Sequence, residues 1–259
     1  MRARNALLGL AALATAWFAP PAQAQTAIGE TGLTVSGSLG IQSDYLFRGI
    51  SQTASRMAGQ ASAEVLHSSG LYIGGFISNV YFAPAAAFPQ RAEIDGLVGF
   101  RFSAFDINFD VGAVWYTYHG QRAGFARLNY AEAVIKAARE IGPVTVNGTV
   151  AFSPNFYGSS GFGAYVEGGA DWTTGFQGIV LGGRVGYQHI ERTAVFGAPS
   201  YANWNLTVSR TFDLGSLGNV VASVGYYDTS IGRSRCIPIA GGGQNICGPR
   251  ALGALTWKF

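Results

Sequence analysis

The sequence predicts an all-β protein: a transmembrane antiparallel up-and-down β-barrel of about twelve strands, preceded by a cleaved signal peptide. Three observations predict it. Apolar and polar residues alternate through most of the chain, nearly all charges in the alternating segments fall on one side of the alternation, and long and short connections alternate. Because successive side chains of a strand point to opposite faces, the pattern describes a sheet with one apolar and one polar surface.

An export signal precedes the alternating region. Two arginines come before an apolar run at 6–18, and a small-x-small cleavage site follows at 22–24. This order is typical of a secretory signal peptide, so we expect residues 1–24 to be removed and residues 25–259 to form the barrel domain. An uncleaved anchor fits less well, because the run is shorter than a membrane span. Without the leader the formal net charge falls from +3 to +1, so no nucleic-acid partner is indicated.

The composition favours a membrane-embedded sheet over a soluble one. Hydrophobic residues make up 48% of the chain and charged residues only 12%. No stretch after the leader approaches the roughly 18 consecutive apolar residues of a membrane helix. In a soluble sandwich the apolar face points inward, whereas in an outer-membrane barrel it faces lipid and the polar face lines the lumen.

Twelve segments carry the alternation, at 34–48, 57–66, 71–80, 91–102, 106–118, 129–138, 143–153, 163–172, 176–188, 201–210, 219–228 and 250–259. The long connections are 49–56, 81–90, 119–128, 154–162, 189–200 and 229–249, and the shorter ones are 67–70, 103–105, 139–142, 173–175 and 211–218. Bacterial outer-membrane barrels have an even strand number, long outer loops, short periplasmic turns and both termini inside. The pattern therefore predicts the outer membrane of a Gram-negative cell.

Two of these segments are ambiguous. The segment at 129–141 has a helix-forming composition, with Glu132 and Lys136 at the favourable i,i+4 spacing. We expect a strand there, because Ala131 and Ile135 keep the alternation and because its removal would leave an odd number of strands. The segment at 71–80 has apolar residues on both faces, so its register is not predicted.

The polar face predicts the wall of a lumen. Its candidate pore-lining residues are Asp44, Arg48, Glu64, Glu93, Asp95, Arg101, Asp110, Glu132, Lys136, Glu167, Asp171 and Arg184. Arg91, Arg250 and Lys258 share that face, and Arg210 is the exception. A basic residue on the lipid face at the bilayer midplane would cost about 2–4 kcal/mol, so the charged face should point inward. Alternatively, these residues pair with one another and only satisfy a buried polar interior.

Aromatic residues on the apolar face predict interfacial girdles. They are Tyr45, Phe47, Phe100, Phe102, Trp115, Phe152, Trp172, Tyr187, Trp204, Trp257 and Phe259, and most lie near strand ends. Membrane barrels carry such girdles at both interfaces. A sandwich core also favours aromatics, so this feature alone does not separate the two folds.

The loops contain two cysteines and several arginines. Cys236 and Cys247 are the only cysteines, and in an exported chain they predict a structural disulfide. Two such ligands without a nearby histidine are too few for a metal site, and no cofactor is expected.

Arginines outnumber acids at the predicted outer ends of the strands. The acids there are Glu191 and Asp228, and the arginines are Arg48, Arg56, Arg122, Arg127, Arg192, Arg233 and Arg235. This basic rim is expected to attract anionic solutes or lipopolysaccharide phosphates, unless it is an ordinary solvated surface.

A family resemblance spans nearly all of the mature chain. Residues 43–53 (Ser-Asp-Tyr-Leu-Phe-Arg-Gly-Ile-Ser-Gln-Thr) resemble the opening signature of the TorF family of porins. Similar short matches follow at 70–74, 78–80, 93–95, 129–132, 165–167 and 201–204. The resemblance implies an outer-membrane barrel with a strand at 129–138, and it implies no substrate or catalytic residue. The chain departs from the family pattern in the alanine run at 131–138, at Asn203 and in the cysteine loop.

The favoured function is a narrow channel for passive diffusion of small hydrophilic solutes or ions. Twelve strands lie between eight, whose interior is filled by side chains, and the sixteen to eighteen of wide porins. One alternative is a non-conducting barrel whose loops bind a partner. Another is an outer-membrane hydrolase using His119 and His189 or the pair Glu93 and Asp95, but none of these lies in a nucleophile motif, so no enzyme is predicted.

The end of the chain predicts a partner. Leu255, Trp257 and Phe259 resemble the terminal signature read by the barrel-assembly machinery. The expected partners are therefore that machinery, the lipid bilayer with its lipopolysaccharide, and small polar solutes.

Overall fold

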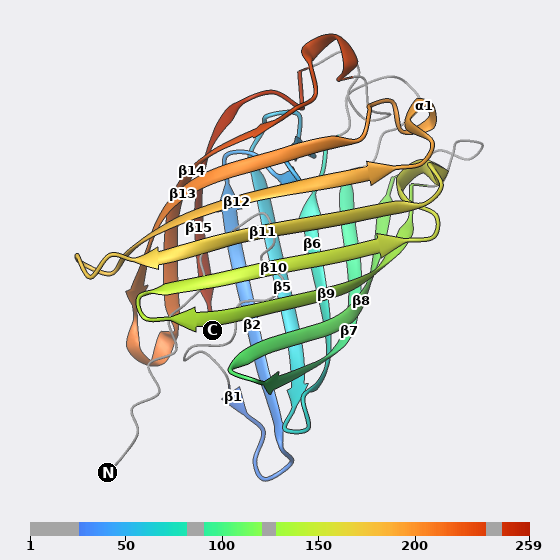
Figure 1. Cartoon of the computed structure of the whole chain (residues 1–259). Helices are drawn as coiled ribbons and strands as arrows, with labels where there is room; N and C mark the ends of the chain where they lie inside the picture. The colour runs from blue at the N-terminus through green and yellow to red at the C-terminus, as the bar shows by residue number, and fades with distance from the viewer. Residues whose placement is uncertain (1–25, 82–90, 121–127, 237–244) are drawn as a thin grey trace.

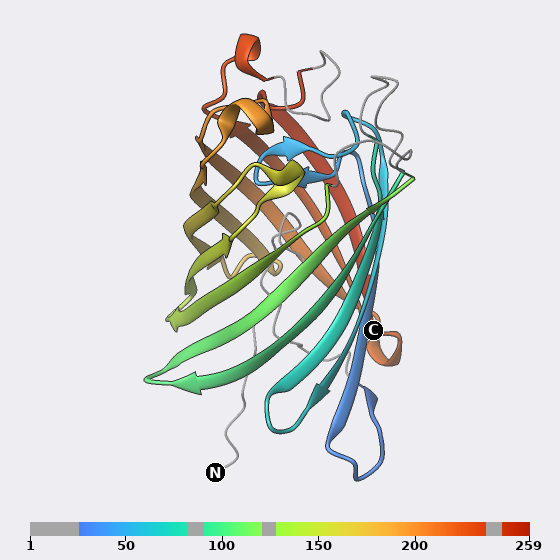
Figure 2. The ribbon, with the colours of Figure 1, turned by 90° about the vertical axis from the view of Figure 1, so that its right-hand side faces the viewer.

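The computed structural model describes residues 26–81, 91–120, 128–236 and 245–259. It is a closed antiparallel barrel of twelve wall strands (Figures 1 and 2). They are β2 (Leu33–Gln42), β5 (Ala58–His67), β6 (Leu71–Asn79), β7 (Ala92–Ala104), β8 (Ile107–His119), β9 (Tyr130–Ile141), β10 (Val144–Ser153), β11 (Gly163–Thr173), β12 (Ile179–Ile190), β13 (Tyr201–Asp213), β14 (Asn219–Thr229) and β15 (Arg250–Lys258). The predicted fold class and strand number are confirmed. The predicted signal peptide, residues 1–24, lies outside the described residues.

Each wall strand pairs with the next along the chain, and β15 closes the ring by pairing with β2. This seam runs from Ala254 opposite Gln42 to Lys258 opposite Ser38. A short strand, β1 (Thr26–Ala27), is added to the edge of β2. Among the described residues, no helix combines the length and the apolar character needed to cross a membrane.

The connections divide the barrel into two ends. The long ones, at 43–57, 80–91, 120–129, 154–162, 191–200 and 230–249, form the long-loop end, and the short ones, at 68–70, 105–106, 142–143, 174–178 and 214–218, form the short-turn end. α1 (Thr193–Phe196), η2 (Tyr157–Ser159) and η4 (Arg233–Arg235) belong to long connections, and η3 (Gly215–Leu217) to a short one. Because the strands alternate in direction, β2 begins and β15 ends at the short-turn end. The predicted alternation of connections is confirmed.

The period of two sets which side chains face inward. On β12, Val185 and Tyr187 are exposed on the outside, whereas Arg184 and Gln188 are buried inside.

Both segments that were ambiguous in the sequence are strands. The segment with helical composition is strand β9, so the helical alternative is wrong. Its pairing with β8 and β10 outweighs local propensity. The ambiguous β6 turns Tyr72 inward, between the exposed neighbours Leu71 and Ile73.

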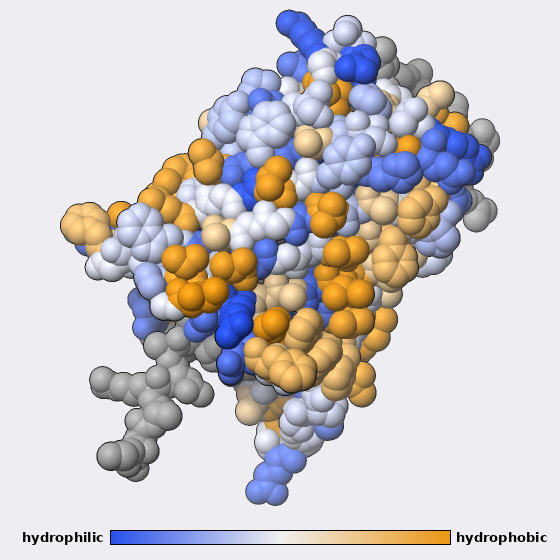
Figure 3. All heavy atoms as spheres, in the orientation of Figure 1, coloured by the Kyte–Doolittle hydropathy of each residue, from blue (hydrophilic) through white to orange (hydrophobic). Residues whose placement is uncertain are grey.

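The outer surface of the barrel is apolar. Figure 3 shows apolar residues gathered over the middle of the visible strands and hydrophilic ones concentrated toward the ends. The predicted girdle residues Phe100, Phe102, Trp115, Phe152, Trp172, Tyr187, Trp204, Trp257 and Phe259 are exposed there. Arg210, the predicted exception, faces outward near the short-turn end, where its guanidinium lies 4.9 Å from the centre of the Phe212 ring.

The first predicted strand, 34–48, is too long, because residues 43–48 do not continue it. β2 ends at Gln42, and the chain then turns into the barrel as a small hairpin of β3 (Leu46–Phe47) and β4 (Ile50–Ser51). Arg48 and Gly49 form its two-residue turn with φ of 49° and 81°, the positive values that hairpin turns of this length require. A Cβ on Gly49 would lie 2.6 Å from Thr229 Cγ2, so glycine also permits the close approach to β14.

Candidate functional site

The inward-folded segment 43–56, here called the plug hairpin, occupies the barrel interior at the long-loop end. Figure 2 shows β3 and β4 inside the ring of strands. Tyr45 and Phe47, predicted on the lipid-facing girdle, therefore lie inside: Tyr45 is 5% exposed, and the Phe47 ring packs 5.7 Å from the Tyr116 ring of β8. The alternation within this segment comes from packing inside the barrel rather than from a lipid-facing strand.

Arg48, at the tip of the plug hairpin, reaches the far wall. Its Nη1 and Nη2 donate to Glu132 Oε1 and Oε2 at 2.9 and 2.7 Å, and Nη1 also donates to Gln188 Oε1 at 2.6 Å. The guanidinium lies over the Phe47 and Tyr165 rings at 4.6 and 4.2 Å. Burial by itself lowers the pKa of Arg48, but the Glu132 carboxylate raises it to a net value above the usual range. The bidentate ion pair between Arg48 and Glu132 thus crosses the interior of the barrel.

Tyr45 fixes the same hairpin to β7. Its hydroxyl donates to Glu93 Oε1 at 3.0 Å, and its ring meets the Phe76 ring of β6 at 6.1 Å. Burial raises the pKa of the Tyr45 phenol, and the Glu93 carboxylate raises it further, so Tyr45 remains a neutral donor. Glu93 and its neighbour Asp95 are 1% and 3% exposed, and Asp95 Oδ1 accepts the Thr117 N–H at 3.3 Å.

The base of the plug hairpin is also tied to the wall. Leu46 forms a buried apolar cluster with Tyr227, Leu252 and Ala254 of β14 and β15. Asp44 Oδ2 accepts from Arg250 Nη1 at 2.8 Å. Within the hairpin, Asp44 Oδ1 accepts from the hydroxyls of Ser51 and Thr53 at 2.6 and 2.8 Å. Strands on several sides of the barrel therefore hold the hairpin in place.

A second ion-paired group, here called the wall cluster, consists of Glu64, Tyr72, Arg101 and Asp110 on β5 to β8. Arg101 donates from Nη1 and Nη2 to Glu64 at 2.6 and 2.7 Å, and from Nε to Asp110 Oδ2 at 3.0 Å. The Tyr72 hydroxyl donates to Asp110 Oδ1 at 2.7 Å. The side chains of Arg101 and Glu64 are each 19% exposed. This cluster runs along the wall and reaches water.

The remaining pore-lining candidates also face inward. Arg184 Nη2 donates to Asp171 Oδ2 at 2.6 Å, next to an Asn147 amide that donates to the same oxygen at 3.0 Å. Glu167 Oε2 accepts from the Tyr165 hydroxyl at 2.7 Å. Lys136 is half-buried on β9.

The structure thus brings most of the predicted polar residues together in ion pairs and hydrogen bonds inside the barrel. The plug hairpin that organises several of these pairs was not predicted. Its one sequence signal is the Arg48-Gly49 dipeptide between apolar residues, which is weaker than the Asn-Gly or Asp-Gly usual in such turns.

The predicted basic rim is only partly at the rim. Arg48 lies inside the barrel at the tip of the plug hairpin, where its guanidinium is paired with Glu132. Arg56, Arg192, Arg233 and Arg235 are exposed at the long-loop end, and Arg122 and Arg127 lie outside the described residues. The Arg56 guanidinium lies 3.7 Å from the centre of the Tyr81 ring.

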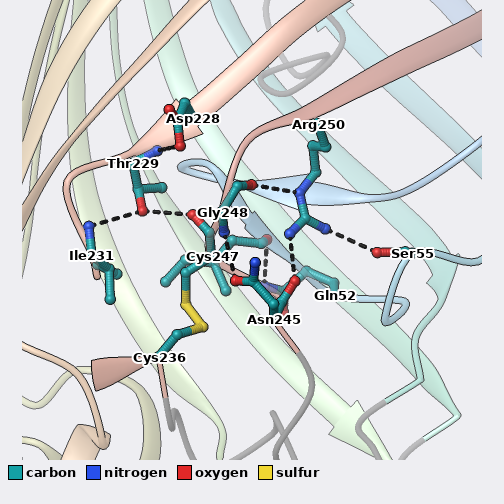
Figure 4. Close-up of a disulfide and its surroundings, with 11 residues drawn as sticks. Gln52, Ser55, Asp228, Thr229, Ile231, Cys236, Asn245, Cys247, Gly248 and Arg250 are labelled. Carbon is teal, nitrogen blue, oxygen red and sulfur yellow. Dashed lines mark hydrogen bonds between the residues drawn. A yellow bond between two sulfur atoms is a disulfide. The ribbon is translucent and has the colours of Figure 1, made fainter. Parts of the chain in front are cut away.

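The predicted disulfide is confirmed. Cys236 and Cys247 are bonded, and their side chains are buried near the rim of β14 and β15 (Figure 4). In the described part of the chain, no group of three or more histidine, cysteine, aspartate or glutamate residues could hold a metal ion.

The histidines and the paired acids lie on opposite faces of the wall. His119 on β8 and His189 on β12 are exposed and occupy outward-facing positions of their strands. Glu93 and Asp95 are buried on the inward face of β7. The structure does not bring these four residues into one constellation.

The C-terminal residues seal the seam of the barrel. Leu255, Trp257 and Phe259 are exposed on the outer face at the short-turn end. The Phe259 and Gly37 backbones exchange hydrogen bonds of 2.7 and 3.0 Å. A Cβ on Gly37 would lie 2.8 Å from the Phe259 ring, so glycine leaves the space that this ring occupies.

Comparisons with known proteins agree with this architecture. The KdgM porin in complex with disordered oligogalacturonate is 9% identical, with a TM-score of 0.52 over 87% of this chain and 98% of that chain. KdgM porin alone (8% identity, TM-score 0.51, 87% and 98% coverage) and NanC porin (6%, 0.51, 86% and 98%) are also similar. At these identities the likeness shows the fold, which is that of outer-membrane porins.

A search of curated proteins found no match. A family model described as "Bacterial protein of unknown function (Gcw_chp)" matches residues 26–241. The TorF name suggested by the motifs is not what this comparison returns. The chain belongs to the Gcw_chp family of bacterial proteins of unknown function.

Proposed function

We propose that the chain is a narrow outer-membrane channel for the passive diffusion of small hydrophilic solutes or ions, with the plug hairpin as its constriction. The observation that carries this proposal is the inverted barrel: a polar, ion-paired interior enclosed by an apolar exterior. A soluble barrel would place its apolar face inside.

The exposed apolar residues support a membrane location. Ile73, Val98, Val185 and Leu206 are 53–67% exposed on the outside of different strands. Soluble monomers rarely expose apolar patches larger than a few hundred Å². An acyl-chain environment would remove this surface from water, and the polar lumen would keep the ionisable residues out of lipid.

The solute class is proposed from the interior. The wall cluster offers both charge signs to water, with Glu64 and Arg101 each 19% exposed. A wall of mixed charge suits small polar solutes or ions rather than apolar ones. One similar porin is described in complex with oligogalacturonate, which gives a precedent for a polar ligand on this fold. No covalent chemistry or cofactor is proposed.

We also propose that residues 1–24 are removed on export and that residues 25–259 form the mature protein. The barrel-assembly machinery would read Leu255, Trp257 and Phe259. The exposed Arg56 and Arg192 would meet lipopolysaccharide phosphates at the long-loop end. Deleting Phe259 should reduce the amount of assembled barrel in outer-membrane fractions, and unchanged assembly would contradict this role.

One observation favours a second candidate, a non-conducting barrel whose loops bind a partner. Around the plug hairpin the inward side chains of Glu93, Glu132 and Gln188 are each 1% exposed, so this level of the interior is tightly packed. If the plug hairpin never moves from this position, no solute passes and the loops are the functional surface.

Planar-bilayer recording distinguishes the two candidates. The channel proposal predicts discrete current steps from purified protein, and reversal potentials in salt gradients would give the ion preference. A closed bilayer at all voltages, together with loop-dependent partner binding, would favour the second candidate.

A further inference from the structure

We infer that the disulfide Cys236–Cys247 clamps the plug hairpin from the long-loop end, so that the oxidation state of this bond controls how firmly the constriction is held. This inference rests on the proposed channel function for its effect on transport. The contacts between residues 245–250, the disulfide and the hairpin do not depend on that function.

A backbone contact joins the clamp to the plug hairpin. The Ser51 N–H donates to the carbonyl of Ile246 at 2.9 Å. Ile246 immediately precedes Cys247, and the two residues are 2% and 0% exposed. Strand β4 of the hairpin is therefore hydrogen-bonded to the residue beside the disulfide.

Arg250 adds a side-chain link between the same two segments (Figure 4). Its Nη1 donates to Asp44 Oδ2 at 2.8 Å and to Ser55 Oγ at 3.2 Å, near the start and the end of the hairpin. Its Nη2 donates to the Asn245 carbonyl at 3.0 Å, and its Nε to the Gly248 carbonyl at 3.1 Å. One guanidinium thus joins both ends of the hairpin to both sides of Cys247.

The disulfide holds this segment against the barrel rim. The Thr229 hydroxyl, at the end of β14, donates to the Cys247 carbonyl at 2.7 Å and accepts the Ile231 N–H at 3.2 Å. Cys236 follows Ile231 in the segment that leaves β14, and Cys247 precedes β15, so the cross-link joins the chain leaving β14 to the chain entering β15. A cross-link of this kind restricts the conformations available to the loop that it closes.

Reduction would release that restriction. A dithiol such as dithiothreitol attacks one cysteine sulfur, the Cys236–Cys247 bond breaks, and the reagent leaves as a cyclic disulfide. Two electrons and two protons pass from the dithiol to the protein, which then carries two thiols. The carbonyls of Asn245 and Ile246 are then free to move, and Arg250 and Ser51 lose fixed partners. Arg48 and Tyr45 still hold the hairpin, so the expected change is loosening rather than expulsion.

The test compares oxidised protein, protein treated with dithiothreitol after folding, and the variant Cys236→Ser/Cys247→Ser. Treatment after folding avoids any need for the disulfide during assembly, and heat-modifiable gel migration checks that the barrel stays closed. Hydrogen exchange of amides in 43–56 should accelerate on the order of tenfold on reduction, while amides in the middle of β10 keep their rates. Single-channel conductance should rise in parallel. Dithiothreitol should change nothing further in the double-serine variant.

The outcomes separate the two proposals. If wild-type protein conducts but reduction alters neither exchange in 43–56 nor conductance, the clamp is wrong and the channel stands. If reduction accelerates exchange but no condition yields current, even after the plug hairpin is shortened, the clamp stands and the channel function is wrong.

Discussion

The plug hairpin and the wall cluster both depend on an arginine, but the two ion-paired groups run in different directions. Arg101 joins Glu64 and Asp110 along one side of the barrel, and its side chain is 19% exposed. Arg48 crosses the interior to Glu132, and these two side chains are 8% and 0% exposed. Water therefore reaches the wall cluster and is excluded around the tip of the plug hairpin.

This difference sets how much each group contributes. Ion pairs that contact water are screened and contribute little, whereas removing one partner of a buried pair leaves an uncompensated charge. Under the proposed channel function, the plug hairpin would control passage and the wall cluster would set the charge of the path beside it.

The largest effect is expected from Arg48→Met. This change leaves Glu132 buried without its cation, at a cost of about 3–5 kcal/mol to the docked hairpin. Hydrogen exchange in 43–56 should accelerate strongly and conductance should rise. The double variant Arg48→Met/Glu132→Met removes both charges and should lie closer to wild type than the single variant. A double variant as disturbed as the single one would show that the pair is not what docks the hairpin.

A smaller effect is expected from Tyr45→Phe. The phenylalanine keeps the ring contact with Phe76 but removes the donor to Glu93, and an unsatisfied buried acceptor costs about 1–3 kcal/mol. Exchange in 43–56 should accelerate less than in Arg48→Met. The outward change Tyr187→Phe is the matched control and should leave exchange in this segment unchanged.

The smallest effect on the hairpin is expected from Arg101→Met. Water reaches part of the freed Glu64 carboxylate, which is 19% exposed, so the loss in stability should be smaller than in Arg48→Met, where Glu132 is fully buried. Exchange in 43–56 should not change. The reversal potential should move toward cation selectivity, because a positive charge leaves the wall. Faster exchange in 43–56 together with an unchanged reversal potential would show that Arg101 holds the plug hairpin and does not set the charge of the wall.

Much of the barrel could be predicted from sequence because its register is local. Alternation identified all twelve wall strands, including β9, although its alanine-rich composition suits a helix. The disulfide could be predicted because only one pairing of two cysteines exists. The interior contacts could not, since Arg48 and Glu132 are 84 residues apart and no local pattern links them. The plug hairpin was missed because its own side chains also alternate, so 43–48 resembled a continuation of β2.

If the barrel is the proposed channel, the plug hairpin rather than the barrel wall limits passage. The most direct measurement is single-channel conductance after residues 45–52 are replaced by two glycines, with Asp44 and Arg250 retained. Conductance should rise severalfold, because the replacement removes the side chains that fill the interior of the twelve-strand barrel at the long-loop end. Conductance equal to wild type in a variant that still forms a closed barrel would contradict it.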